Sequence, residues 1–113
     1  MSRTFKLRTH IRIPITCFVD YVGEGLIGTG VVHDLSADGA QIQGLPSQPV
    51  TVGKHLALRI TLPNQHTPIE IEAAVVQWVQ GHEFGVHIVD MSSEGKARVR
   101  RFIESAVNLR HAI

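Results

Sequence analysis

The stretch that organises the chain reads LIGTGVVHDLSADGAQIQ, residues 26–43. Its first part, Leu26–His33, reads as a strand whose glycines indicate a bulge or a barrel bend. Apolar and polar residues alternate again over Ala40–Gln43, which predicts a short strand. Between them lies Asp34-Leu35-Ser36-Ala37-Asp38-Gly39, a D-x-S-x-x-G pattern of residues that favour turns. The stretch therefore predicts two strands joined by a turn over residues 34–39.

Strand-like alternation recurs on both sides of this stretch. Before it, residues 11–22 alternate and end at the turn signal Gly23-Glu24-Gly25. After it, residues 44–53 contain prolines and glycines and read as a loop. Around residues 74–78 the period blurs, which favours a bulge or burial on two sides. The strands predicted beyond the loop are Leu56–Leu62, Pro68–Val79 and Phe84–Ile88.

The last segment of the chain has a helical period instead. Ser92 or Ser93 is placed to cap a helix, and Glu94 suits its first turn. One face is apolar and must pack on the sheet: Val99, Phe102, Ile103, Ala106 and Leu109. The other face carries Lys96, Arg98, Arg100 and Arg101, which we expect to be solvated, a partner protein or membrane surface being the alternative.

Six short strands followed by a helix predict one mainly β domain, a small barrel with a C-terminal helix. The chain of 113 residues is long enough for a single core. We expect a flexible basic arm over residues 1–12, the barrel over 13–90 and the helix over 92–110.

Charge is unevenly distributed, although the net charge is only +1. Residues 1–12 hold four basic residues and no acidic one, residues 13–91 hold two and eight, and residues 92–113 hold five and two. A basic arm and a basic helix beside an acidic body suit a local anion site. A net charge of only +1 does not suit a surface that coats nucleic acid, so no nucleic-acid polymer is expected as a partner.

The cysteine content and the hydropathy pattern are typical of a protein from a reducing compartment. The single cysteine, Cys17, excludes an internal disulfide and favours a reducing environment. It alternates with Ile15 and Val19, which predicts a buried structural thiol. No signal peptide is evident, and no apolar run approaches the roughly 20 residues of a membrane span. A cytoplasmic protein without a membrane span is expected.

Two motifs carry residues suited to a guanine nucleotide. Arg8 and Arg12 form R-x-x-x-R, and in an extended arm residues four apart project from the same side. Their guanidinium groups can bind phosphate oxygens or the O6/N7 edge of guanine. In the turn, the Asp34 carboxylate can accept from a guanine N–H edge, and the Ser36 hydroxyl can donate or accept beside it. Gly39 permits a sharp bend or a close backbone approach.

In both motifs, and over nearly its whole length, the chain resembles PilZ domains, bacterial receptors for the second messenger cyclic di-GMP. The resemblance implies a six-stranded antiparallel β-barrel with a C-terminal helix. It implies that Arg8 and Arg12 clamp phosphates and guanine edges while Asp34, Ser36 and Gly39 surround one guanine. The arm is then expected to close over the ligand, and an unidentified effector protein to respond to the changed surface.

Four further residues have to be considered beside the two motifs. His10, between the two arginines, can stack on a base, contact a phosphate or stay solvated. Gln77 and Trp78 lie on a strand that faces the ligand in the family, but core packing is expected for Trp78. Asp38 is expected to be a turn residue.

Other functions have less support in the sequence. A PilZ-fold adaptor that binds protein without a ligand is the alternative, although both motifs are complete here. A barrel that binds RNA or single-stranded DNA needs aromatic stacking platforms, and aromatic residues are few. No catalytic motif is present, so an enzyme is not expected. The histidines lack zinc-ligand spacing, no cofactor is expected, and the protein should be a monomer or a weak dimer.

Overall fold

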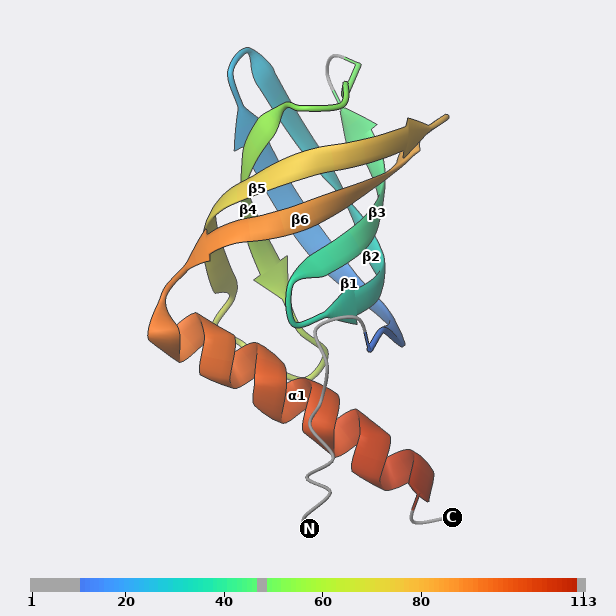
Figure 1. Ribbon diagram of the computed structural model, residues 1–113, viewed down its shortest axis with the longest axis vertical. Coiled ribbons are helices and arrows are strands. Elements are labelled where there is room, and N and C mark those ends of the chain that lie inside the picture. The colour runs from blue at the N-terminus through green and yellow to red at the C-terminus, as the bar shows by residue number, and fades with distance from the viewer. Residues whose placement is uncertain (1–10, 47–48, 112–113) are drawn as a thin grey trace, which may run out of the picture.

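A six-stranded antiparallel barrel dominates the structure, a computed structural model that describes residues 11–46 and 49–111. The strands close in the order β1-β2-β3-β6-β5-β4, and helix α1 runs past one end of the barrel (Figure 1). The predicted fold class is confirmed. The elements are β1 Ile13–Gly23, β2 Leu26–Ser36, β3 Gly39–Pro46, β4 His55–Thr61, β5 Ile69–Gln80, β6 Glu83–Met91 and α1 Ser93–His111.

The core of the barrel is built by alternation along each strand. In β4, Leu56, Leu58 and Ile60 are buried between more exposed neighbours, as the clean period of this stretch predicts. In β1 the same alternation buries Cys17, which confirms the predicted buried thiol. Burial disfavours the charged thiolate and raises the pKa of Cys17 to about 11.

Two glycines make room for the one tyrosine in the barrel. The Tyr21 ring is buried and meets Phe84 edge-on, with ring centroids 5.3 Å apart. A Cβ atom on Gly28 or Gly44 would lie 2.4 or 2.2 Å from atoms of this ring. The register of β2 shifts between Val32 and Asp34 rather than at Gly28, so of the two predicted alternatives, a bulge or a barrel bend, the bulge is wrong at this glycine, and close packing explains it.

The D-x-S-x-x-G stretch is more regular than its sequence predicts. β2 continues through Asp34 to Ser36, and β3 begins at Gly39, so only Ala37 and Asp38 form the turn. Ser36 and Gly39 are directly paired across the two strands. The irregularity between Val32 and Asp34 adjusts the register so that the strand carries on instead of ending. Asp34 is therefore a strand residue, not a turn residue.

Helix α1 is capped and packed as its sequence indicates. The N–H of Gly95 donates to Oγ of Ser92 at 3.0 Å, which identifies Ser92 as the capping residue. Val99 and Ile103 are buried, and Phe102 packs partly against the core. These contacts fix one face of the helix against the barrel.

Arg98 corrects the prediction of a wholly solvated basic face. Its guanidinium donates to the carbonyls of Thr67 and Pro68, at 2.6 and 3.2 Å, and to Oε1 of Gln65 at 2.6 Å. These acceptors lie in the loop between β4 and β5. Arg98 therefore ties the helix to the barrel, whereas Lys96, Arg100 and Arg101 are exposed.

Candidate ligand-binding site

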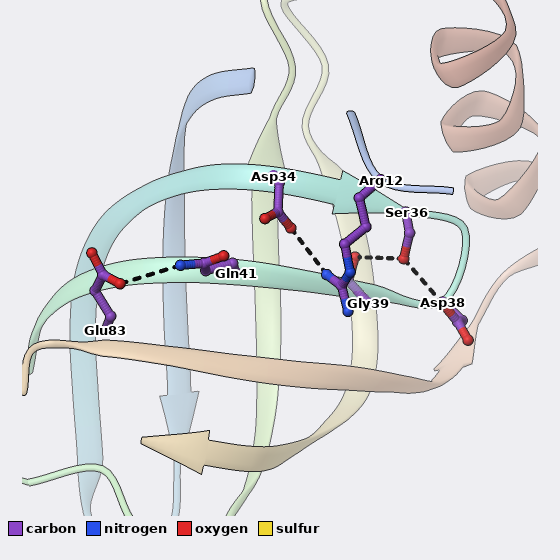
Figure 2. Close-up of polar contacts among 7 residues, drawn as sticks. All are labelled: Arg12, Asp34, Ser36, Asp38, Gly39, Gln41 and Glu83. Atoms are coloured by element: carbon purple, nitrogen blue, oxygen red, sulfur yellow. Dashed lines mark hydrogen bonds and ion pairs between the residues drawn. The ribbon is translucent and has the colours of Figure 1, made fainter. Parts of the chain in front are cut away.

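The second arginine of R-x-x-x-R contacts the first residue of D-x-S-x-x-G. Nη1 of Arg12 donates to Oδ1 of Asp34 at 3.0 Å (Figure 2). Strand pairing explains the contact, because Pro14 in β1 lies opposite Asp34 in β2 and Arg12 precedes Pro14 by two residues. The Arg12 side chain is 55% exposed and that of Asp34 23%, so both remain accessible to a ligand. The two motifs therefore meet at one place on the surface.

A row of side chains extends from this ion pair across four strands. Asp34 lies opposite Gln41 in β3, Gln41 opposite Gly85 in β6, and Gly85 opposite Trp78 in β5. The side chain of Gln41 also donates to Oε1 of Glu83 at 3.2 Å (Figure 2). Neighbouring positions on four strands thus present, in order, the carboxylate of Asp34, the amide of Gln41, the backbone of Gly85 and the indole of Trp78.

A cavity of about 270 Å³ lies over this row. Its polar wall consists of Arg12, Asp34, Gln41 and Gln77. Trp78 supplies the aromatic wall. The cavity thus combines a cation, a carboxylate, amides and a flat ring, which together match the groups of a purine nucleotide.

Trp78 does not pack in the core, so that prediction is wrong. The side chain is 38% exposed and covers Gly85, where a Cβ atom would lie 2.1 Å from its Nε1. The register of β5 shifts between Val76 and Trp78, which turns the indole outward while Val76 stays buried. The blurred period over residues 74–78 was the sequence signal for this change.

Ser36 and Gly39 shape the hairpin beneath the site rather than lining the cavity. Ser36 is fully buried, and its hydroxyl lies 3.0 Å from Oδ1 of Asp38 and 3.3 Å from the carbonyl of Gly39. A Cβ atom on Gly39 would lie 2.7 Å from the carbonyl oxygen of Val86, so β6 approaches too closely for a side chain there. Among the described residues Ser36 bonds to no histidine, which does not fit a nucleophile paired with a base.

Asp38 is a turn residue, as predicted, and it joins the turn to β6. Its carbonyl accepts from the N–H of Ile88 at 2.7 Å, and its Oδ2 lies 4.0 Å from Nδ1 of His87. The turn is thereby held against a third strand.

Of the six predicted site residues, the structure brings Arg12 and Asp34 together and places Ser36 and Gly39 at the turn end of the same β2–β3 hairpin, outside the cavity lining. Arg8 and His10 lie outside the described residues. Sequence reasoning gave Gln41 no role beyond strand alternation. A glutamine on a predicted strand has no local signal that distinguishes it from other exposed polar residues.

The PilZ domain family model matches residues 6–105, which include both motifs. The chain belongs to the PilZ domain family. The resemblance drawn from the two motifs is thereby confirmed. No curated protein sequence matches this PilZ chain significantly.

Two solved structures share the fold of this PilZ chain at low sequence identity. The PilZ domain of CeSA from a cellulose synthesizing bacterium is 19% identical, with a TM-score of 0.66, covering 85% of this chain and 97% of that one. The Bacillus subtilis inhibitor of motility, MotI/DgrA, is 19% identical, with a TM-score of 0.74, covering 92% of this chain and 53% of that one. The present chain therefore spans about half the length of the motility inhibitor. In the part of the PilZ chain that the structure describes, no helix is apolar and long enough for a bilayer crossing.

Proposed function

We propose that this PilZ chain is a receptor for cyclic di-GMP that binds the ligand between Arg12, Asp34 and Trp78 and signals to a partner protein. The observation that carries the proposal is the 3.0 Å contact of Arg12 with Asp34 beside a cavity that has an indole as one wall. Cyclic di-GMP offers two guanines and two phosphates, so a site for it needs a cation, an acceptor for guanine N–H groups and a stacking surface.

The ion pair leaves both partners with unused hydrogen-bonding capacity. A guanidinium has five N–H donors, and the described contact with Asp34 uses one of them. Phosphate oxygens or a guanine O6/N7 edge can take the others. Of the Asp34 carboxylate, Oδ1 accepts from Arg12, and Oδ2 can accept from the N–H edge of a guanine. Asp34 in turn holds Arg12 in place, which lowers the entropy cost of binding.

Trp78 and the two glutamines supply the remaining contacts of the proposed site. Stacking of a base on an aromatic ring is worth about 1–3 kcal/mol. The exposed indole of Trp78 offers such a surface, and the amides of Gln41 and Gln77 can each donate and accept at a guanine edge. In this proposal Ser36 and Gly39 act indirectly, by holding the hairpin that positions Asp34.

We further propose that Arg8 and His10 contact the ligand from the arm that precedes β1. Arg12 immediately precedes Ile13, the first residue of β1, and it lines the cavity, so the arm joins the barrel beside the cavity. Binding would then order the arm over the ligand and change the surface that an effector protein meets. Cyclic di-GMP is an intracellular messenger of bacteria, so this role places the protein in the bacterial cytoplasm.

Isothermal titration of the protein with cyclic di-GMP tests the proposal. We expect saturable binding that is weakened by Arg12→Ala and by Asp34→Ala. Arg59→Ala is the matched control, because the Arg59 side chain is 58% exposed against 55% for Arg12 and also forms an ion pair, with Glu70 at 2.8 Å, on β4 and β5. Cyclic di-AMP should compete poorly, since adenine lacks the O6 acceptor and N1–H donor of guanine.

Absence of saturation up to about 50 µM cyclic di-GMP would refute the receptor function. The chain would then be better described as a ligand-independent PilZ-fold adaptor. If Arg12→Ala and Arg59→Ala changed the affinity for cyclic di-GMP equally, the protein would still be a receptor, but its binding site would not be at the Arg12–Asp34 pair.

A further inference from the structure

A second surface lies on the outer face of β1, β2 and β3, away from Arg12 and Asp34. Strand pairing puts its side chains in rows: Phe18 beside Val31, Asp20 beside Thr29, and Val22 beside Ile27. Thr29 is also paired with Leu45 of β3. These rows approach the β1–β2 hairpin, whereas Asp34 lies at the opposite end of β2. We refer to Phe18, Asp20, Val22, Ile27, Thr29, Val31 and Leu45 as the hairpin face.

The hairpin face is unusually apolar for an outer surface. Phe18 and Leu45 are each 75% exposed, Ile27 66% and Val22 48%. Half of the eight exposed large hydrophobic residues in the described part of the chain belong to it. Contiguous exposed apolar side chains of this kind mark interaction surfaces, whereas scattered ones need no explanation.

The hairpin face is hollowed on both sides of Asp20 and Thr29. One cavity, of about 370 Å³, lies toward β4 and includes Ile27. The other, of about 530 Å³, lies toward β3 and includes Phe18 and Leu45. Both cavities share Asp20 and Thr29 in their walls. We refer to Asp20 and Thr29, which lie between the two hollows, as the ridge. Two hollows on either side of it can receive bulky side chains that are spaced along one helix, strand or loop of a partner.

The charge of the hairpin face is concentrated in one carboxylate. Arg59, which lies opposite Asp20 in β4, is paired with Glu70 through a 2.8 Å contact. The Asp20 side chain makes no hydrogen bond or ion pair with any other residue that the structure describes. Covering this carboxylate with an apolar partner would desolvate it without compensation. An occupant must therefore bring a cation to the ridge between the two hollows.

The barrel topology restricts how an occupant can dock. Residues 18–23 of β1 are paired with both β2 and β4, and Thr29 and Val31 of β2 are paired with both β1 and β3, so a partner strand finds no free edge at these residues. A second copy docked about a twofold axis would bring two Asp20 carboxylates toward each other. A partner helix meets both restrictions, because it docks through its side chains alone. Its apolar residues would recur at helical spacing, with a basic residue among them.

We propose that the hairpin face binds a cationic amphipathic helix of a partner protein. Apolar side chains of that helix fill the hollows beside Phe18 and Ile27, and a lysine or arginine pairs with Asp20. This inference does not depend on the proposed ligand site, because the two surfaces share no residue.

A selection experiment tests this chemistry with a defined probe. A three-helix scaffold is displayed on phage, and one exposed helix face is randomised to all amino acids. The library is selected on the full-length protein and counter-selected on the Phe18→Thr, Leu45→Thr double variant. Threonine suits a β-strand surface, and both replaced side chains are 75% exposed, so the variant should keep the fold, which amide NMR spectra check.

Enriched helices should carry apolar residues at spacings of three or four and at least one lysine or arginine. Their affinity should fall at least tenfold in the double variant and at least threefold in Asp20→Asn. Val89→Thr is the matched control, because Val89 is 57% exposed on β6, outside the hairpin face, and should change nothing.

Three results would overturn the proposal. The first is a failure to enrich any helix that distinguishes the protein from the double variant. The second is enrichment of helices without a basic residue. The third is a dimer in analytical ultracentrifugation that the double variant abolishes, which would assign the hairpin face to a second copy of this chain.

Discussion

Arg12 and Asp34, separated by 22 residues in sequence, form a 3.0 Å ion pair that joins the two motifs of the chain. The pair lies at an exposed position, where Coulomb attraction is screened by solvent. Its contribution to stability is therefore small, and in the proposed receptor its role is to orient the guanidinium for the ligand. This difference separates its effects on folding from its effects on binding.

We predict that Arg12→Ala and Asp34→Ala each weaken cyclic di-GMP binding by about 1–3 kcal/mol, which is roughly five- to 150-fold in Kd. Each should lower the free energy of unfolding by less than about 1 kcal/mol. The double variant should lose less binding energy than the two single losses combined, because each residue acts partly through the other. Calorimetry and urea unfolding measure the two quantities, with Arg59→Ala as control. Fully additive losses would contradict a shared site.

We predict that cyclic di-GMP quenches the fluorescence of Trp78. This residue is the one tryptophan of the sequence, so the signal needs no label. Trp78→Ala should weaken binding by about 1–3 kcal/mol, and Trp78→Phe by less because a ring remains. Because the side chain is partly exposed, neither change should abolish folding, which a thermal melt checks. Unchanged emission at calorimetric saturation would mean that no base stacks on Trp78.

We predict opposite consequences for two glycine-to-alanine variants. In Gly39→Ala the new Cβ meets the backbone oxygen of Val86 at 2.7 Å, which cannot move without disturbing the pairing of β3 with β6. The free energy of unfolding should fall by about 1–3 kcal/mol. In Gly85→Ala the new Cβ meets the Trp78 side chain, which can rotate toward solvent. Ligand affinity should then fall more than stability does. Urea unfolding and calorimetry on both variants give the comparison, and equal stability losses would contradict it.

We predict that the buried thiol makes stability depend on alkaline pH. The pKa of Cys17 is raised from 9.0 to about 11 by burial, so the folded state keeps its proton where the unfolded state loses it. The contribution of the protonated thiol is complete below about pH 9 and is lost as the pH rises toward about 11. Burial raises the pKa of Tyr21 as well, and that group acts in the same direction.

Urea unfolding of the wild type and of Cys17→Val between about pH 8 and about pH 10.5 measures this effect. The wild type should lose more stability over that range than the variant, which keeps Tyr21 but has no thiol. If the free energy of unfolding fell equally steeply with pH in both proteins, Cys17 would not be shielded from solvent in the folded state. Slow alkylation of the folded wild type, and fast alkylation in urea, is the independent check.

The regular strands and the helix could be predicted because they depend on interactions between residues that are close in sequence. The alternation of Leu56, Leu58 and Ile60 and the capping serine Ser92 each depend on near neighbours in sequence. The two motifs were also expected to come together, and Arg12 and Asp34 do meet. Their contact depends on the pairing of β1 with β2, which the turn signal at residues 23–25 indicated, and on the register of that pairing, which the sequence did not indicate.

The predictions that were wrong concern residues whose placement is decided by another strand or element. The register shift beside Trp78 turns the indole outward, and the shift beside Asp34 lets β2 continue through the motif. Arg98 finds its acceptors about 30 residues away, in the loop between β4 and β5. The blurred period over residues 74–78 did indicate an irregularity beside Trp78, but periodicity contains no information about which strand or loop a residue will contact.

The pairing of Ser36 with Gly39 gives the spacing of D-x-S-x-x-G a geometric meaning. The serine and glycine close a two-residue turn, and the aspartate stands two positions back, opposite Gln41. Because strand side chains alternate, lengthening the turn by one residue would either leave that residue unpaired as a bulge or shift β3 by one position, which turns Gln41 to the other side of the sheet while β1 still holds Asp34. The spacing of the motif is therefore part of its structural role. Insertions between Asp34, Ser36 and Gly39 should be far less tolerated than substitutions at the positions that the pattern leaves open.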